Sequence, residues 1–407
     1  MLPTDPTNSD IAPEVVNHCG LYAHVPFCET KCGYCDFYSV PTHNRRTAPL
    51  VAALQRELTH RLSQPPYPVR TVFCGGGTPT ILPTDELRSL LSCIGGLVPL
   101  GTLAEFTVEA NPATVDEEKA NVLSEAGVTR VSMGAQSFFT EELATLERLH
   151  TPDDIAPSVA TLRRAGIAQI NVDLIFGIPG QTVQTWRESL TRAIALDPDH
   201  IACYGLTYEP GTRLTAMRDH GRMTPCGESL EVDLYETTTE QLAKAGLAQY
   251  ETSNFAKPGC ESQHNLIYWR NEPYVGVGPS GTGCVHGRRY KNVADVNAYV
   301  RRIQAEGTAE ASTEIITREM LMHEMLMMQL RLLEGLSVAD FMKRTGANPW
   351  ELFRIIIKRL ATQGLIAVSD THIALTPRGR LLSDAVITEF ALACGNAEVP
   401  LRVIGQG

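Results

Sequence analysis

The sequence predicts an α/β fold in which a partial (β/α)6 barrel is followed by a C-terminal α+β domain. Short apolar segments alternate with amphipathic, helix-like stretches through the first half of the chain, a pattern typical of a parallel sheet. The eight repeats of a closed barrel are not visible before this alternation ends near residue 210. We therefore expect six strands in an open barrel.

Each expected strand is a short apolar run, and the helix-like stretch after it has apolar residues at three-to-four spacing. These stretches often open on Thr or Asp and close on Gly, as helices do. The six expected strands are 21–25, 71–75, 106–110, 130–134, 170–176 and 200–206.

Two regions with different sequence patterns follow the barrel. The first has one helical stretch and then an irregular aromatic, Gly-rich run, and we expect it to extend or cover the barrel. The second is helical with a short β pair, an order that resembles a winged-helix module. The predicted units are a flexible lead-in (1–19), the barrel (20–210), a middle segment (211–310), the winged-helix-like domain (311–390) and a tail (391–407).

Composition restricts the classes of partner. The net charge of −11 and the nine basic and nine acidic residues in 311–390 disfavour nucleic-acid binding. No apolar run is long enough for stable membrane insertion, and the N-terminus lacks the pattern of a signal peptide. We therefore expect a cytoplasmic protein, in which clustered cysteines serve as metal ligands or catalytic groups rather than disulfides.

The segment "CETKCGYCDF" places Cys28, Cys32 and Cys35 on one loop after the first expected strand. A structural zinc site would need a fourth ligand, and no second cysteine pair lies at a suitable spacing. Three thiolates suit a cubane [4Fe–4S] cluster with one iron left free for an external ligand.

The C-x3-C-x2-C spacing resembles the signature of radical S-adenosylmethionine (SAM) proteins. In that superfamily the free iron chelates the amino and carboxylate groups of SAM, and the cluster supplies one electron to cleave a carbon–sulfur bond. Tyr34, directly before the third cysteine, is at the position of the aromatic that packs near the adenine. A plain loop aromatic would look the same.

Other polar residues stand at the ends of successive expected strands, where barrel enzymes place their sites. The glycines of "CGGGTPT" either form a tight turn or let the backbone approach a ligand. Glu109 is either a buried ion-pair member or an anchor for ribose hydroxyls. Gln136, Arg148 and Asp173 complete a predicted polar ring at one barrel mouth, although each alone could be structural.

Six motifs together resemble the oxygen-independent coproporphyrinogen oxidase family over about residues 20–390. They are "LYAHVPFCETKCGYCDF", "FCGGGTPT", "VEANP", "RVSMGAQSF", "INVDLIFGIPGQT" and "HNLIYW". By position, the resemblance implies cluster ligands at Cys28, Cys32 and Cys35. It implies SAM contacts at Tyr22, Gly76, Gly77, Thr78, Glu109, Gln136, Arg148 and Asp173.

One departure distinguishes the branches of this family. The oxidases have a further cysteine two residues after the third ligand, and here that position is Phe37. The chain therefore resembles the HemW branch, whose members are viewed as haem chaperones. This implies a [4Fe–4S] cluster, SAM and haem as ligands, a haem-acceptor protein, and an electron donor of flavodoxin or ferredoxin type. The alternative is an oxygen-independent coproporphyrinogen III oxidase or a related radical SAM enzyme that modifies porphyrins, such as a methyltransferase.

The segment "HNLIYW" is the predicted haem site. His264 offers an imidazole to iron, and Tyr268 and Trp269 offer flat apolar faces to a porphyrin. The alternative is ordinary packing, with a histidine ring bonded to a backbone carbonyl beside core aromatics. The resemblance favours the haem site.

Overall fold

A computed structural model describes residues 16–43, 46–63 and 65–393. The predicted lead-in (1–19) and tail (391–407) therefore lie mostly outside the described residues.

The predicted partial barrel is confirmed. Its six strands pair in parallel in chain order, and each lies within a few residues of the expected range. They are β1 (Cys19–Val25), β4 (Val69–Gly76), β5 (Glu105–Ala110), β6 (Arg130–Gln136), β7 (Gln169–Phe176) and β8 (His200–Gly205). Because all six run the same way, the segments that follow them meet at one edge of the sheet.

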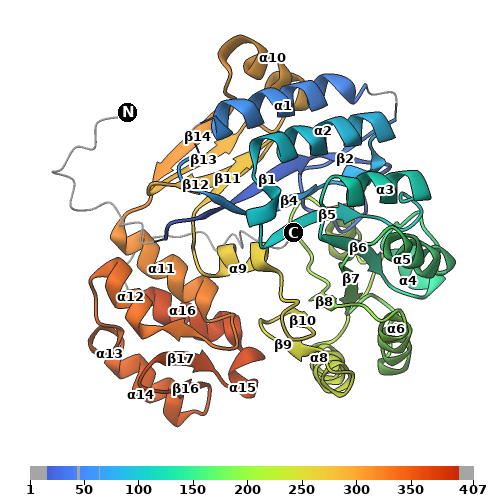
Figure 1. Cartoon of the computed structure of the whole chain (residues 1–407). Coiled ribbons are helices and arrows are strands. Elements are labelled where there is room, and N and C mark those ends of the chain that lie inside the picture. Colours follow the sequence, from blue (N-terminus) through green and yellow to red (C-terminus); the bar gives the residue numbers. More distant parts are fainter. Residues whose placement is uncertain (1–15, 44–45, 64, 394–407) are drawn as a thin grey trace.

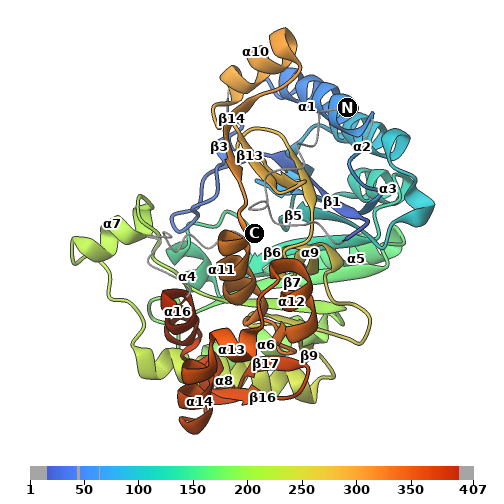
Figure 2. The ribbon, with the colours of Figure 1, turned by 90° about the vertical axis from the view of Figure 1, so that its left-hand side faces the viewer.

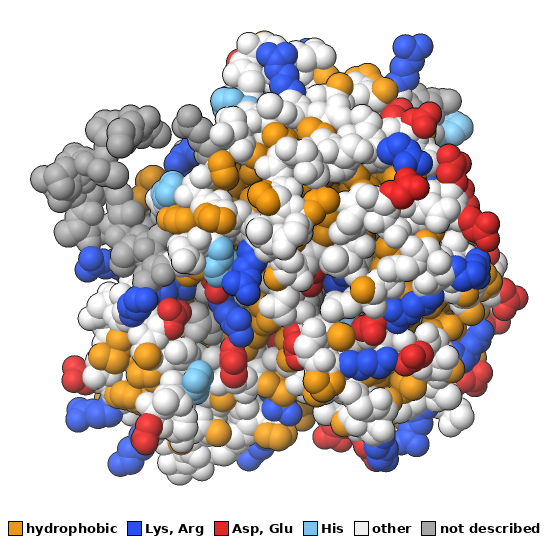
Figure 3. Space-filling model, viewed as in Figure 1, with side chains coloured by type: hydrophobic (Ala, Val, Ile, Leu, Met, Phe, Trp, Pro, Cys, Tyr) orange, Lys and Arg blue, Asp and Glu red, His pale blue; other side chains and the backbone are white. Residues whose placement is uncertain are grey.

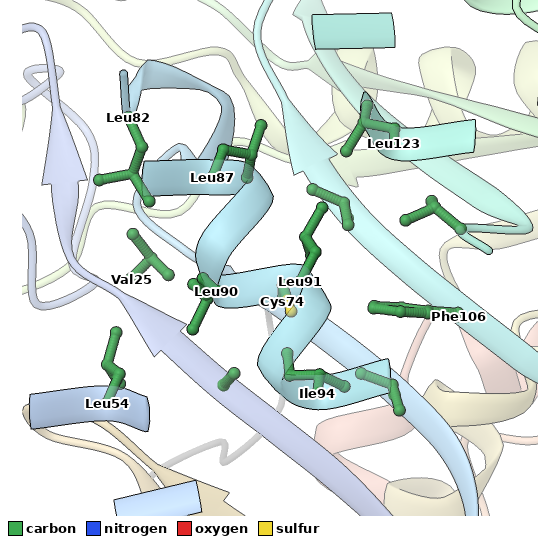
Figure 4. Close-up of a cluster of buried hydrophobic side chains, with 14 of the residues drawn as sticks. Val25, Leu54, Cys74, Leu82, Leu87, Leu90, Leu91, Ile94, Phe106 and Leu123 are labelled. Carbon is green, nitrogen blue, oxygen red and sulfur yellow. The ribbon is translucent and has the colours of Figure 1, made fainter. Parts of the chain in front are cut away.

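Helices cover the outer face of these strands (Figure 1). They are α1 (Ala48–Leu62), α2 (Thr84–Leu97), α3 (Glu117–Glu125), α4 (Thr140–Thr145), α5 (Ile155–Arg164) and α6 (Val183–Ala195). Figure 4 shows part of the apolar core between strands and helices. Leu54, Leu90 and Phe106 belong to this core cluster. Cys74 is fully buried in this cluster, as expected for a cysteine that serves as a small hydrophobe.

The middle segment extends the barrel sheet on both sides to twelve strands. On one side, β11 (Tyr274–Val277) pairs in parallel with β1, and the antiparallel strands β12 (Thr282–Val285), β13 (Arg288–Asn292) and β14 (Glu310–Ile315) follow. On the other side, β10 (Asn254–Ala256) and β9 (Ala248–Gln249) follow β8 antiparallel. The helices of this segment are α7 (Arg213–Asp219), α8 (Glu228–Lys244), α9 (Gln263–Trp269) and α10 (Val296–Glu306).

A buried carboxylate ties the extension to the barrel. Glu57 of α1 is 0% exposed and accepts hydrogen bonds from Arg61 (2.8 Å), the Gly278 backbone N–H (2.9 Å), Asn292 (2.9 Å) and Tyr299 (2.7 Å). A buried charge is tolerated only when it is paired and hydrogen-bonded in this way. Glu57 therefore holds α1, β13 and α10 together.

The C-terminal domain has the predicted winged-helix-like order. Four helices precede the hairpin of the last two strands, a short strand between the first two helices completes a three-stranded sheet, and the domain has its own apolar core. Its elements are α11 (Arg318–Gln329), β15 (Leu336–Ser337), α12 (Val338–Thr345), α13 (Pro349–Leu352), α14 (Arg354–Thr362), β16 (Ile366–Val368), β17 (His372–Leu375), α15 (Pro377–Arg380) and α16 (Ser383–Ala393). Arg289 of β13 donates two hydrogen bonds to Glu324 of α11 (2.8 and 2.7 Å), which joins this domain to the sheet extension.

The surface in Figure 3 has basic and acidic side chains interspersed over the face in view. In the described part of the chain, no helix combines the length and the apolar character that crossing a membrane requires.

We predict that Glu57→Ala lowers the free energy of unfolding by about 3 kcal/mol, because it leaves several buried donors without their acceptor. Urea unfolding followed by intrinsic fluorescence measures the change. Glu118→Ala, at an exposed glutamate on α3, is the matched control and should have almost no effect. Equal stability of the two variants would contradict the role given to Glu57.

Candidate functional site

The cysteine loop is closed at its base by two short strands. β2 (Phe27–Cys28) pairs in parallel with β3 (Val40–Pro41), and the Thr42 backbone N–H donates to the carbonyl of Cys28 (2.8 Å). Within the loop, the Cys35 N–H donates to the carbonyl of Cys32 (3.3 Å). This closure holds three half-buried thiols at the carboxyl end of the barrel, just after β1.

Helix α7 braces the same loop from the middle segment. The Leu214 N–H donates to the carbonyl of Gly33 (2.9 Å), and Arg213 donates to the carbonyl of Lys31 (2.5 Å). Arg213 also pairs with Glu147, which follows α4. Figure 2 shows α7 standing out from the barrel on the side of the cysteine loop.

The three thiols fit a cluster better than a single metal ion. Among the described residues, no three His, Cys, Asp or Glu side chains come close enough together to bind one metal ion. A tetrahedral zinc site needs such convergence, whereas each iron of a cluster takes its own thiolate. The Thr78 hydroxyl lies 3.8 Å from the sulfur of Cys28, and the Arg148 guanidinium lies 3.6 Å from that of Cys32. The hydrogen bond from Thr78 and the positive charge of Arg148 both favour the thiolate form of Cys28.

Burial raises the pKa of the Cys28 thiol and raises that of Cys35 to about 11. These thiols are therefore protonated at neutral pH in the protein without iron. Iron binding must release those protons, so cluster assembly should be more favourable at higher pH.

Arg148 connects the cysteine loop to the predicted ring. Its guanidinium also donates to the side-chain oxygen of Asn111 (2.6 Å) and to the carbonyl of Gly134 (2.6 Å). The amide nitrogen of Asn111 in turn donates to the Thr78 hydroxyl (2.8 Å). The side chains of Asn111, Gln136 and Arg148 all lie close to Gly134, where a Cβ atom would meet them.

The glycine run has a packing role that is independent of any ligand. Gly76 has φ of +100°, a conformation that favours glycine, and its N–H donates to Glu109 (2.8 Å). The N–H groups of Gly77 and Thr78 donate to carbonyls of the segment 25–27. These three backbone donors are therefore used inside the protein.

Two carboxylates of the ring share the barrel interior. Burial raises the pKa of Glu109 to about 8 and that of Asp173 to about 6, and the charge of Asp173 raises the pKa of Glu109 further. Glu109 accepts a hydrogen bond from the Gly76 N–H (2.8 Å), whereas Asp173 accepts from Asn171 (2.6 Å) and Ser132 (3.2 Å). Both side chains remain partly exposed, so a polar ligand can reach them.

The two predicted tyrosines lie in different surroundings. The hydroxyl of Tyr22 is hydrogen-bonded to the Nδ1 atom of His24 (2.8 Å), and its ring lies 6.1 Å from that of Phe73. Tyr34 packs against a small apolar cluster that includes Leu146. That packing is compatible with either role considered for Tyr34.

The predicted haem segment forms helix α9, and His264 points into the barrel. Its ring is fully buried and stacks on Phe73, with ring centroids 5.3 Å apart. Its Nδ1 atom bonds the Thr71 hydroxyl (2.8 Å) and its Nε2 atom bonds the Tyr268 hydroxyl (2.9 Å). Burial lowers the pKa of His264 to about 3, so the ring is neutral. Both ring nitrogens bond hydroxyls and not the backbone carbonyl of the packing alternative, whereas the aromatic neighbours of the ring are as that alternative expects.

The two aromatic residues of the segment are also engaged. Tyr268 lies edge-to-face with Tyr274, at a centroid distance of 4.8 Å. Trp269 is buried in a cluster with Met328 and Leu332 from the C-terminal domain. The segment therefore lies between the barrel and the C-terminal domain (Figure 1).

Helix α9 is held at both ends. At its start, Glu105 accepts from the backbone N–H groups of Gln263 (2.8 Å) and His264 (3.2 Å). At its end, Arg344 of α12 donates to the carbonyls of Arg270 (2.8 Å) and Asn271 (2.7 Å). These partners stabilise the free backbone groups of a short helix.

The cysteine loop and α9 lie at opposite ends of the barrel. His264 contacts Thr71, near the start of β4, whereas the cysteine loop follows the end of β1. Phe73, two residues further along β4, stacks on His264 and lies 6.1 Å from the ring of Tyr22, so aromatic side chains connect the two ends through the barrel interior. The structure therefore gathers the predicted cluster ligands with most of the predicted ring, and it leaves the predicted iron ligand at the other end.

The ring also contains polar residues that were not singled out from the sequence. Asn111 bridges Arg148 and Thr78, and Asn171 and Ser132 hold Asp173. Asn171 precedes Asp173 by two positions, so period-two alternation already puts both on one face of the strand.

Comparisons with known proteins agree with this geometry. Residues 22–193 match the radical SAM superfamily, and residues 316–382 match the HemN C-terminal domain. Heme chaperone HemW of Bacillus subtilis is 37% identical over 371 residues, which cover 91% of this chain and 98% of that protein. The protein of the same name from Escherichia coli K12 is 32% identical, with 91% and 97% covered.

The solved structure of coproporphyrinogen III oxidase (HemN) from Escherichia coli superposes with a TM-score of 0.79. It covers 92% of this chain and 90% of that chain, at 22% sequence identity. At this identity the likeness concerns the fold, and it confirms that barrel, extension and C-terminal domain occur together in one known architecture.

We predict that Cys28→Ala, Cys32→Ala and Cys35→Ala each abolish the visible thiolate-to-iron absorption after anaerobic reconstitution, because a three-thiolate site has no spare ligand. The matched control is Cys74→Ala, at a thiol in the apolar core, which should assemble a normal cluster. Loss of the absorption in a folded Cys74→Ala protein would show that the ligand set is wrong.

We predict opposite effects of Glu109→Gln on binding and on stability. SAM affinity should fall about tenfold, as for the loss of a hydrogen bond to a charged group. The raised pKa of Glu109 means that stability from this group is present below pH about 4.5 and is lost as pH rises through about 8. Above pH 8, the cofactor-free variant should therefore be more stable than the wild type. Unchanged SAM affinity with an intact cluster would exclude the ribose role.

Proposed function

Because the chain belongs to the HemW family of radical SAM proteins, we propose that it is a haem chaperone that binds haem, a [4Fe–4S] cluster and SAM and passes haem to an acceptor protein. The observation that carries this proposal is the similarity to proteins named heme chaperones along nearly their whole length. The proposal extends to action in the cytoplasm and to a flavodoxin- or ferredoxin-type electron donor.

The residues of the barrel mouth have distinct tasks in this proposal. Cys28, Cys32 and Cys35 would each bind one iron of the cluster, and the charge of Arg148 favours the thiolate form of Cys28. Membership of the radical SAM superfamily implies a cluster that, when reduced, can supply one electron to SAM. Glu109 accepts hydrogen bonds from the ribose hydroxyls.

The remaining ring residues orient the rest of SAM in this proposal. The oxygens around Gly76 and Gly77 hold its amino group, while Gln136 and Asp173 complete the polar surface. Tyr22 and Tyr34 supply the aromatic sides. The partial exposure of Asp173 and of the three cysteines supports this assignment.

Phe37 argues against the oxidase alternative. Its side chain is 43% exposed beside the cysteine loop, at the position where the oxidases have a further cysteine. Phenylalanine offers neither a thiol nor a proton. We therefore expect no decarboxylation of coproporphyrinogen by the reconstituted, reduced protein.

Haem ligation by His264 requires a change in α9. A neutral imidazole binds iron through a nitrogen lone pair, and here that lone pair accepts a hydrogen bond from a hydroxyl. We propose that α9 moves away from β4 when haem binds, so that His264 exchanges its hydroxyl partner for iron and Tyr268 and Trp269 become available to the porphyrin.

We predict that His264→Ala weakens haem binding and shifts the Soret band, because it removes the axial ligand. Haem titration of the full chain gives the affinity, stoichiometry and band position. The matched control is His323→Ala, at a buried histidine of the C-terminal domain that bonds the carbonyl of Ala391.

The outcomes of this titration separate the parts of the proposal. An unchanged affinity and band in His264→Ala would move the haem site elsewhere and keep the carrier function. Absence of haem binding by the wild type, or steady loss of carboxyl groups from coproporphyrinogen, would overturn the function itself.

A further inference from the structure

A chain of buried hydrogen bonds ends on the carboxylate of Asp173. Asn171 donates to Asp173 (2.6 Å) and to the Ser132 hydroxyl (2.7 Å), and Ser132 donates to the second carboxylate oxygen (3.2 Å). Behind them, the Nδ1 atom of His200 lies 2.6 Å from the side-chain oxygen of Asn171. The Nε2 atom of His200 lies 2.9 Å from the Tyr250 hydroxyl.

The direction of every bond in this chain is fixed. Both amide hydrogens of Asn171 are used, so its oxygen must accept, and His200 Nδ1 must donate. Burial lowers the pKa of His200 well below its ordinary value, so the ring is neutral and carries one N–H. Its Nε2 atom therefore accepts from the Tyr250 hydroxyl. The tautomer of His200 follows from its partners.

The chain crosses the barrel from the haem segment to the ring. The Tyr250 oxygen accepts from the backbone N–H of Ser262 (3.3 Å), the residue that caps α9. His200 opens β8, and Asn171 and Asp173 lie on one face of β7. His200 is 1% exposed and Asn171 is 3% exposed, so water does not replace either donor.

We propose that Asn171 and His200 are positioning residues for the Asp173 carboxylate at the SAM site, with Tyr250 fixing the His200 tautomer. The inference rests on the proposed SAM site, and it adds three residues that make no contact with SAM themselves. Asn171 and Ser132 each donate to one carboxylate oxygen of Asp173, which fixes the orientation of the carboxylate. The remaining lone pairs of Asp173 therefore point in a fixed direction. Preorganised acceptors of this kind bind a ligand without reorientation at the moment of binding.

A purely structural network would act differently. It would lower stability when it is broken and leave the affinity of the folded protein for SAM unchanged. The two roles therefore separate when affinity is measured on folded protein with a normal cluster spectrum.

The test compares His200→Leu with His200→Asn after anaerobic reconstitution, by calorimetric titration with SAM. Leucine removes the donor to Asn171, and we expect affinity to fall about tenfold. Asparagine places an amide donor where Nδ1 lies, so we expect it to restore most of the affinity. Asn171→Ala removes the donor to Asp173 directly, so its affinity for SAM should fall as much as that of His200→Leu. It replaces His200→Leu in the test if that variant does not fold. His323→Leu is the control outside the network.

Asp173→Asn separates failure of this inference from failure of the proposed function. Weaker SAM binding in Asp173→Asn, with wild-type affinity in both His200→Leu and Asn171→Ala, would overturn the positioning role and keep the SAM site. Wild-type affinity in Asp173→Asn would remove Asp173 from the site, and the positioning role with it.

Discussion

Charge balance at the carboxyl end of the barrel governs the properties of the site. Parallel pairing brings three thiols and the carboxylates of Glu109 and Asp173 to this end, with the guanidinium of Arg148 among them. Without cofactors, burial raises the pKa of Cys28, Cys35, Glu109 and Asp173, so the charged form of each is less favourable here than in water. Iron and the sulfonium of SAM are cationic, so their binding reverses that preference. Ionised thiols and carboxylates therefore destabilise the site when no cofactor is bound. The free energy of cofactor binding offsets this destabilisation.

The position of helix α9 is fixed by contacts with both the barrel and the C-terminal domain. Glu105 holds its start, Arg344 holds its end, and Trp269 is buried against α11. In this conformation His264 completes the interior of the barrel. Haem ligation by His264 would replace the hydroxyl that now donates to the lone pair of its ring. A haem carrier gains from such a cost, since it keeps the affinity low enough for release.

Much of this architecture could be predicted from the sequence. The six strands are clear because buried parallel strands read as apolar runs, and the cysteine spacing is local. The sheet extension was harder, because β9 and β10 have only two and three residues and because β11 pairs with β1, far earlier in the sequence. The same limit applies to the site. Asn111, Asn171 and His200 act through partners on other strands, and the inward orientation of His264 depends on Thr71, almost two hundred residues earlier.

The central claim is that the cysteine loop and the ring of the barrel mouth form one SAM site. The most direct measurement is electron paramagnetic resonance of the reduced, reconstituted protein before and after addition of SAM. A cluster with three thiolate ligands has one accessible iron, so SAM should change its spectrum, and Glu109→Gln should require more SAM for the same change. A cluster whose spectrum does not respond to saturating SAM would contradict the account.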